Sequence, residues 1–174
     1  LGEADVVVAA GAESMTQVPY LLPHARWGRK MGHDTLVDAM HRDGFMCPLA
    51  GMVMGETVEH LAERYGLSRE EQDAFALESQ ARATRAWEEG RFDAEVVAVA
   101  TDGARLERDE HPRADTTLEK LAKLPPVFSR EGTITAGKSP GLTGGAPARG
   151  LMAPDVPRGR GPDPPRRFLA GAAA

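Results

Sequence analysis

A helical period over residues 57–90 constrains the fold of this chain more than any other feature. The period has two parts separated by Gly66, a residue typical of the C-terminal end of a helix. Ser68 and Glu71 have the spacing of a capping box, which predicts that the second helix begins there, and Gly90 ends it. The apolar positions are Val58, Leu61, Ala62 and Tyr65 in the first helix and Ala74, Leu77, Ala81 and Thr84, with Phe75 beside them, in the second.

Shorter elements are predicted on both sides of these helices. Val6–Val8 is a continuous β-branched run, which is typical of a strand buried on both faces of a parallel sheet. Strands are also predicted over 95–101 and 132–137. Short helices are predicted over 36–44 and over 118–124, where two prolines follow. Strands and helices that alternate in this way indicate an α/β fold.

Two segments lack any period. Residues 16–55 carry prolines, glycines and five methionines, and an irregular stretch of this length is usually functional or part of an interface. Residues 139–174 hold seven of the 13 prolines and seven of the 19 glycines, which excludes a long helix or a central strand and is typical of a disordered basic tail. Because a strand follows Leu1 almost at once, we expect the chain to be a fragment of a longer protein.

Composition excludes several classes of function. The net charge of −5 gives no reason to expect nucleic-acid binding. The apolar run at 6–10 is too short to span a bilayer, so we expect no membrane contact. Cys47 is the single cysteine, which suits a reducing compartment, and its apolar neighbours indicate a structural thiol rather than a nucleophile. The spacing of the five histidines predicts no metal site.

The stretch GTITAGKSPGLTGG at 132–145 is the strongest candidate for a binding loop. Its four glycines after the threonines indicate sharp bends or a close approach to another group. The loop has neither the Walker A spacing nor the G-x-G-x-x-G pattern. Two interpretations stay open from the residues alone: a plain connection between strands, or a backbone surface whose N–H groups bond a ligand.

Several stretches together resemble the thiolase family, the acetyl-CoA C-acyltransferases. They include ADVVVAAGAESM, PYLLPHARWGRKMG, MGETVEHLAERYGLSREEQDAFALESQ, GRFDAEVVAV and GTITAG, in order from Leu1 to about Leu142. The resemblance implies a partial thiolase-like α/β fold, namely the end of the N-terminal α/β half plus an inserted loop domain. It implies a core strand at 1–11, the loop domain covering acyl-CoA at 12–140, and a degenerate return into the N-terminal half at 141–174.

The resemblance also implies an activity. Thiolases join or cleave carbon–carbon bonds of coenzyme A thioesters in fatty acid metabolism, and the thioesters are substrates, so no cofactor is expected. The family's catalytic motifs would lie before Leu1 and beyond the last residue. We therefore expect no catalytic residue in this chain, which alone should be inactive. A cytoplasmic homodimer or homotetramer is implied for the parent protein.

Residues that line the substrate can be transferred by the same resemblance. Lys138 stands where the family has asparagine, and we expect it to attract a phosphate of coenzyme A. Pro140 stands where the family has a serine that hydrogen-bonds the pantetheine arm, which puts binding by this loop in doubt. The implied substrate-binding residues are Met54 and Phe128 beside the pantetheine, Arg113 near the nucleotide, Ala136 and Gly137 in the loop backbone, and Pro140.

Two functions other than catalysis by an acyltransferase also stay open. One is a non-catalytic thiolase-like protein that binds coenzyme A thioesters or serves as a partner subunit. The other is a decayed remnant without function, which would account for the prolines and arginines after Pro147. The resemblance fixes neither the length of the acyl chain nor the direction of the reaction.

Overall fold

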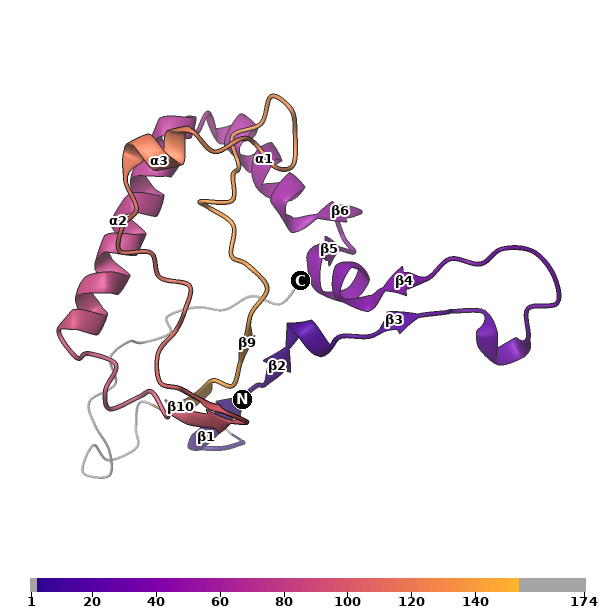
Figure 1. The fold of residues 1–174 in the computed structure, drawn as a ribbon, viewed down its shortest axis with the longest axis horizontal. Helices are drawn as coiled ribbons and strands as arrows, with labels where there is room; N and C mark the ends of the chain where they lie inside the picture. The colour runs from indigo at the N-terminus through magenta and orange to yellow at the C-terminus, as the bar shows by residue number, and fades with distance from the viewer. Residues whose placement is uncertain (1–2, 154–174) are drawn as a thin grey trace. The chain divides into compact units, whose positions relative to one another are not determined.

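The computed structural model describes residues 3–153, and these fall into two units (Figure 1). One unit comprises Leu1–Ser14 and Thr143–Ala174, and the other is Met15–Leu142. The proline-rich segment after residue 153 lies outside the described residues. The inserted loop domain over 12–140 that the resemblance implies, and its role over an acyl-CoA, stay predictions.

The first unit contains two antiparallel strand pairs. The strand β1 (Val6–Ala10) pairs with β10 (Ala148–Met152), and β2 (Glu13–Ser14) pairs with β9 (Gly144–Gly145). The expectation of a parallel strand buried on both faces is therefore wrong for the described residues. All five residues of β1 are exposed there, and the strand's one described partner runs antiparallel.

The strand β10 lies in the proline-rich segment for which the sequence excludes a central strand, and its one described partner is β1. Pro147 precedes it, so the missing proline N–H removes no bond from its ladder, and the Pro147 carbonyl accepts from the Gly11 N–H at 3.1 Å. Arg149 stands opposite Ala9 and Gly150 opposite Val8. Since β10 is exposed along its length, an arginine side chain can reach solvent from it.

The helices of the second unit confirm the predicted spans and caps. They are α1 (Met54–Tyr65), α2 (Arg69–Glu88) and α3 (Leu118–Ala122). Gly66 ends α1 with a φ of 63°, a left-handed conformation that glycine adopts without a steric penalty. At the start of α2 the Glu71 N–H donates to Ser68 Oγ, and the Ser68 N–H donates to the Glu71 carboxylate. The small apolar core consists of Ala39, Ala62, Ala76, Leu121 and Ile134. The apolar positions predicted for the first helix are confirmed only at Ala62, which is buried, whereas Val58, Leu61 and Tyr65 are exposed.

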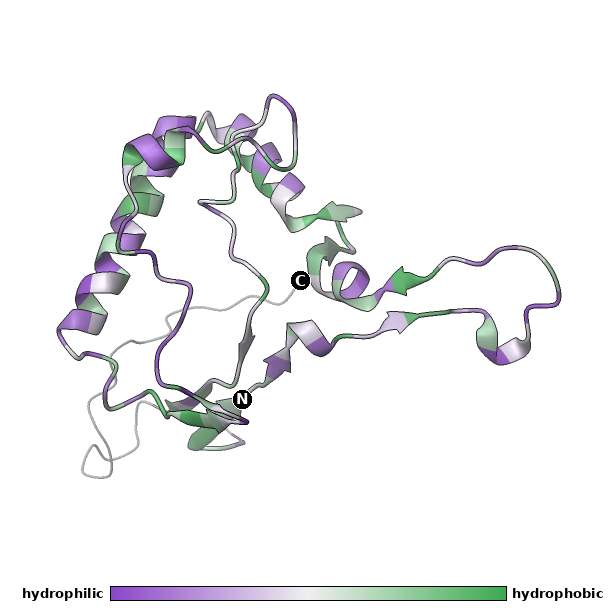
Figure 2. Ribbon diagram, viewed as in Figure 1, coloured by the Kyte–Doolittle hydropathy of each residue, from purple (hydrophilic) through white to green (hydrophobic). Residues whose placement is uncertain are grey.

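The predicted inner face of α2 is wrong at half of its positions. Leu77 and Thr84 are half-buried as expected, whereas Ala74 and Ala81 are exposed, and Phe75 beside them is 77% exposed. The fully buried residues of the helix are Asp73 and Ala76. Figure 2 shows hydrophobic and hydrophilic residues mixed around this helix, so hydropathy alone does not define a single core-facing stripe. Polar contacts between α2 and residues 132–145, here called the glycine loop, decide which face of the helix is covered.

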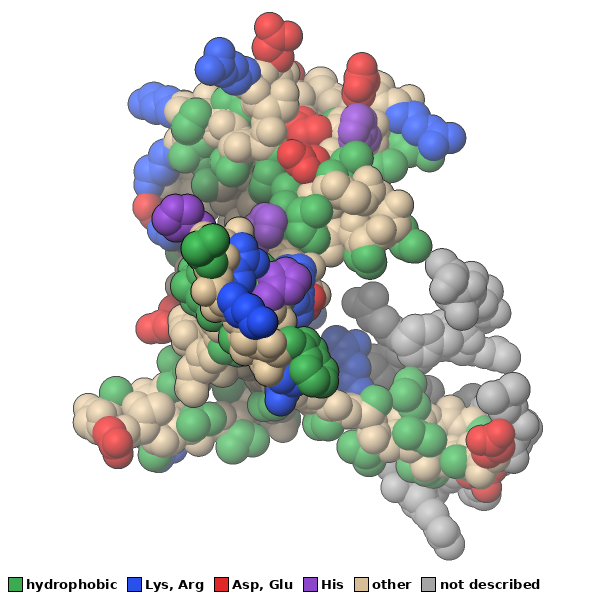
Figure 3. Space-filling view, turned by 90° about the vertical axis from the view of Figure 1, so that its right-hand side faces the viewer, with side chains coloured by type: hydrophobic (Ala, Val, Ile, Leu, Met, Phe, Trp, Pro, Cys, Tyr) green, Lys and Arg blue, Asp and Glu red, His purple; other side chains and the backbone are tan. Residues whose placement is uncertain are grey.

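The segment before α1 is irregular, as expected, and includes a long hairpin arm between β3 and β4. The arm exposes Trp27 (89%) and Met31 (92%), and Figure 3 looks onto its end, where Lys, Arg and His side chains gather. The expected helix over 36–44 is wrong at its start, because Val37–Asp38 is a strand and a single π-helical turn follows. The short elements are η1 (Met15–Gln17), β3 (Tyr20–Leu21), η2 (Ala25–Trp27), β4 (Val37–Asp38), η3 (His41–Phe45), β5 (Met46–Cys47) and β6 (Met52–Val53).

Two predicted strands after α2 are shorter or absent. Of residues 95–101 only β7 (Val99–Thr101) is a strand, and it forms a hairpin with β8 (Ala104–Leu106). Residues 132–137 form no strand, only an isolated bridge between Thr135 and Pro126. The N–H groups of Thr133 and Ile134 have a different acceptor, described below.

Candidate functional site

At the start of the glycine loop, a carboxylate accepts the backbone hydrogen bonds that a neighbouring strand would accept in a sheet. Glu59 projects from α1 and accepts from the Thr133 N–H at 2.8 Å and the Ile134 N–H at 2.9 Å. The Thr133 hydroxyl donates to the same carboxylate at 3.1 Å and accepts from Gln72 Nε2 of α2 at 2.9 Å. Hydrogen bonds to an ionised carboxylate are stronger than neutral ones, so Glu59 fixes this backbone firmly.

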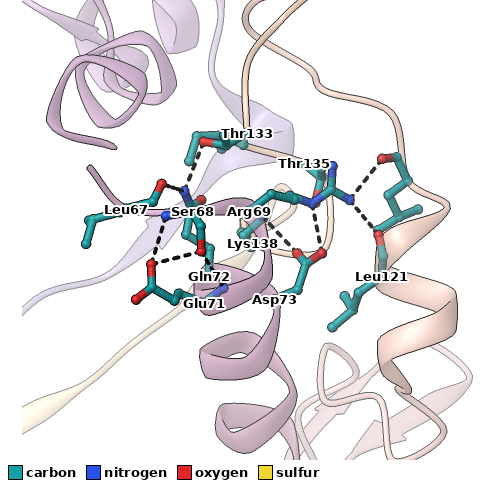
Figure 4. Close-up of polar contacts among 12 residues, drawn as sticks. Leu67, Ser68, Arg69, Glu71, Gln72, Asp73, Leu121, Thr133, Thr135 and Lys138 are labelled. Atoms are coloured by element: carbon teal, nitrogen blue, oxygen red, sulfur yellow. Dashed lines mark hydrogen bonds and ion pairs between the residues drawn. The ribbon is translucent and has the colours of Figure 1, made fainter. Parts of the chain in front are cut away.

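A second carboxylate, Asp73, joins the loop to α2 and α3. Its Oδ2 pairs with Arg69 Nε at 2.8 Å, and its Oδ1 lies 2.9 Å from Lys138 Nζ (Figure 4). The side chains of Asp73 and Lys138 are only 6% and 8% exposed. Arg69 also donates to the carbonyls of Leu121 at 2.7 Å and Leu124 at 3.1 Å, which ties down the end of α3.

Both carboxylates have pKa values below their ordinary range. For Glu59, burial opposes ionisation, but the hydrogen bonds from Thr133 and Ile134 outweigh it and lower the pKa below 4.5. For Asp73, burial again opposes ionisation, and the contacts with Lys138 and Arg69 lower the pKa below 3.8. Both carboxylates are therefore ionised at neutral pH. We call Glu59, Arg69, Asp73 and Lys138 the charged cluster.

The charged cluster predicts a loss of stability in acid. A carboxyl group whose pKa is lowered by folding stabilises the native state above its unfolded-state pKa, and this contribution disappears as the pH falls through the folded-state value. We expect the urea midpoint to be flat from pH 7 to about 5 and to fall below about 4.5. The loss of stability in acid should be smaller in E59Q, because this variant lacks one of the two carboxylates that cause it. E78Q should keep the full loss, because Glu78 is exposed and lies outside the charged cluster. Equal acid slopes for the two variants would contradict this origin.

The structure corrects the expectation for Lys138. Its ammonium group is buried against Asp73, so it is not a surface charge available to a phosphate. Its backbone N–H donates to the Thr135 carbonyl at 3.0 Å and closes a turn that contains Ala136 and Gly137. Gly137 packs so closely that a Cβ there would lie 2.5 Å from Leu121 Cδ2. Ala136 is exposed at the tip of this turn.

Met54 and Phe128 come together at the N-terminus of α1. Met54 is the first residue of the helix and is half-exposed, and the Phe128 ring lies on the next residue, Gly55. A Cβ on Gly55 would lie 2.1 Å from the ring, so this approach requires glycine. The Val127 N–H donates to the Ile134 carbonyl at 2.9 Å, which joins the phenylalanine segment to the glycine loop.

Arg113 and Pro140 lie on two segments that meet. The Arg113 N–H donates to Gln80 Oε1 of α2 at 2.8 Å, and its side chain is exposed. Next to Pro140, Gly141 faces the His111 imidazole, because a Cβ on Gly141 would lie 2.8 Å from His111 Cε1. The end of the glycine loop thus lies beside the segment that carries Arg113.

Sequence reasoning missed Glu59, Asp73 and Gly55. The i, i+4 spacing of Arg69 and Asp73 was the available signal for one ion pair, but nothing local marks Glu59 as an acceptor for residues 74 positions away. Within residues 3–153 no three His, Cys, Asp or Glu residues are placed to hold a metal ion. No helix of this described part combines the length and hydropathy needed to cross a bilayer.

Comparison with known proteins gives one family. The family model "Thiolase, N-terminal domain" matches residues 1–155. The chain is 47% identical over 156 residues to an acetyl-CoA acetyltransferase of Pseudomonas aeruginosa, and 44% identical over 159 residues to a probable acetyl-CoA acyltransferase of Staphylococcus aureus. These matches cover 87% and 88% of this chain but 40% of each relative, so the chain spans about two-fifths of their length.

Solved structures agree with this result. An acetyl-CoA acetyltransferase from Syntrophomonas wolfei superposes with a TM-score of 0.79 at 44% identity. Human mitochondrial 3-ketoacyl-CoA thiolase in complex with CoA gives 0.78 at 40% identity. Each match covers 88% of this chain and 39% of the solved one. The predicted partial α/β fold of this class is therefore confirmed.

Proposed function

Because this chain belongs to the thiolase family, we propose that the whole protein is an acyl-CoA acyltransferase. It would cleave a 3-ketoacyl-CoA with coenzyme A, or join two acyl-CoA molecules in the reverse direction. Such a reaction needs an acylated nucleophile and donors for the developing oxyanion. The chain contributes a surface for the thioester in this proposal, and we expect no turnover from the chain alone.

The meeting of Phe128 with the N-terminus of α1 carries the proposal. A pantetheine arm is largely apolar with two amide groups, and it needs an apolar surface beside free backbone groups. Met54 and the Phe128 ring provide the apolar part, and Ala136 lies exposed in the neighbouring turn. The exposed Arg113 guanidinium suits a phosphate of the nucleotide. A relative of known structure at 40% identity was solved in complex with CoA, which supports this ligand.

Truncating Phe128 tests the proposal directly. We expect F128A to weaken coenzyme A binding to the chain about tenfold, because it removes an apolar wall of the arm's surface. F75A is the matched control, since Phe75 is 77% exposed on α2. Isothermal titration calorimetry gives the affinities, and circular dichroism checks that both variants fold. The same affinity for F128A and F75A would reject Phe128 as a binding residue.

A protein that binds coenzyme A thioesters without turning them over is the second candidate. Both candidates need the loop to hold the pantetheine arm, and Pro140 weakens that contact, because proline offers neither a hydroxyl nor an N–H to a pantetheine amide. We expect P140S to tighten coenzyme A binding about 2- to 10-fold, the range for one recovered neutral hydrogen bond. Calorimetry at fixed salt measures this change. Unchanged or weaker binding by P140S would show that the loop uses other contacts.

Activity of the whole protein separates the two candidates. Release of acetyl-CoA from acetoacetyl-CoA and coenzyme A would establish the acyltransferase. Binding without release would favour the second candidate, and neither binding nor release would favour a decayed remnant. A cytoplasmic location, a role in fatty acid metabolism and assembly into a homodimer or homotetramer belong to the same proposal. The exposed Trp27 and Met31 of the hairpin arm support assembly, since large exposed apolar side chains mark interfaces.

A further inference from the structure

Lys138 is held both by its ammonium group and by its backbone N–H. Its Nζ lies 2.9 Å from Asp73 Oδ1, with both side chains almost completely buried. Its backbone N–H closes the turn with the Thr135 carbonyl, which also accepts from the Ser139 hydroxyl at 3.1 Å. Lys138 therefore joins the turn to α2 through its ion pair with Asp73.

Lys138 is the cation that pairs with the second carboxylate oxygen of Asp73, Oδ1. Arg69 Nε donates to Oδ2 of Asp73, and Arg69 Nη2 donates to the carbonyls of Leu121 and Leu124. Oδ1 faces Lys138 alone among the described cations. Glu59 also lies in the field of the Lys138 charge, which contributes to the lowering of its pKa. Without the ammonium group the charged cluster would hold two carboxylates and one guanidinium.

The turn held in this way carries two of the proposed ligand contacts. Gly137 packs against Leu121 and Leu124 of the α3 end, and Ala136 faces outward. We infer that Lys138 is a positioning residue, an internal counter-ion that fixes the turn Thr135–Lys138 on α2 and so orients the backbone of Ala136 and Gly137 toward coenzyme A. It does not contact a phosphate of the ligand itself. This inference rests on the proposed function.

The experiment compares three variants of the full chain. K138M removes the charge and keeps most of the side-chain length, and K138Q keeps a donor for Asp73 without the charge. K123M is the matched control, because Lys123 follows α3 and is exposed. Coenzyme A affinity is measured by calorimetry at two salt concentrations. Hydrogen exchange is measured over residues 132–141 and, as an internal reference, over 70–88.

We expect K138M to weaken coenzyme A binding about 3- to 10-fold and to raise exchange over 135–139, while K123M changes neither. K138Q should lie between the two. The salt dependence of binding should be the same in K138M as in the wild-type chain, because a buried ammonium group makes no screened contact with a phosphate. A merely structural lysine would alter exchange but leave the affinity of folded K138Q at the wild-type value.

Three results would overturn the inference. One is K138M binding as tightly as K123M. Another is a flatter salt dependence in K138M, which would place the ammonium group on a phosphate. The third is unchanged exchange over 135–139. If the wild-type chain binds no coenzyme A, the proposed function fails separately, and exchange in K138M and K138Q still decides whether Lys138 holds the turn. If K138M does not fold, K138Q supplies the affinity and the salt dependence.

Discussion

Replacing Asp73 with asparagine should destabilise the chain by about 3–5 kcal/mol. The change leaves Arg69 and Lys138 as two cations without their shared counter-ion, and the Lys138 side chain is only 8% exposed. Removing one partner of a buried ion pair is costly because the other charge remains out of water. Urea unfolding followed by circular dichroism measures the change, and loss of the helical signal without denaturant would be its extreme form.

E78Q is the matched control for D73N. Glu78 also lies on α2 and pairs with Arg82 at 2.6 Å across an i, i+4 spacing, but both side chains are more than half exposed. An exposed pair of this kind contributes about 0.3–0.5 kcal/mol. If D73N were no less stable than E78Q, the burial of the charged cluster would not be what holds α2 to the glycine loop.

Replacing Glu59 with glutamine should cost about 2–4 kcal/mol of stability. A carboxylate accepts from Thr133 and Ile134 at once, whereas an amide has one acceptor oxygen and would turn its NH₂ group toward the other donor. Hydrogen exchange of the two amides should rise most steeply, before any change in α2. E63Q on the exposed face of the same helix should change neither stability nor exchange. Full protection of Thr133 and Ile134 in E59Q would show that they have another acceptor.

Local signals predicted the helices, and contacts distant in sequence explain most of the errors. Gly66 and the Ser68–Glu71 pair lie within a few residues of the ends that they mark, so the sequence alone places α1 and α2. The GTITAG stretch resembles a strand by composition, but its donors bond Glu59, which is 74 residues away. No periodicity in a short window can reveal a side chain that replaces a strand partner.

The candidate site shows the same division. Met54, Phe128, Ala136 and Gly137 were named by family resemblance, and the structure brings their segments together. Lys138 was assigned to a phosphate from its place in the loop, where the family has asparagine. Its burial depends on Asp73, and the apolar stripe predicted for α2 did not include Asp73. A charged residue on a buried face is predictable only when its partner is known.

The contact of Glu59 with Thr133 also leads us to expect a particular order of folding events. Helices such as α1 and α2 form from neighbouring residues, but this contact closes a loop of 74 residues and must first overcome the entropy of that closure. We therefore expect the glycine loop to acquire its shape after both helices have formed. Contacts that form after the transition state slow unfolding rather than speed folding. Most of the stability lost in E59Q should therefore appear as a faster unfolding rate, with little change in the folding rate. Glu59 would then determine the lifetime of the folded glycine loop.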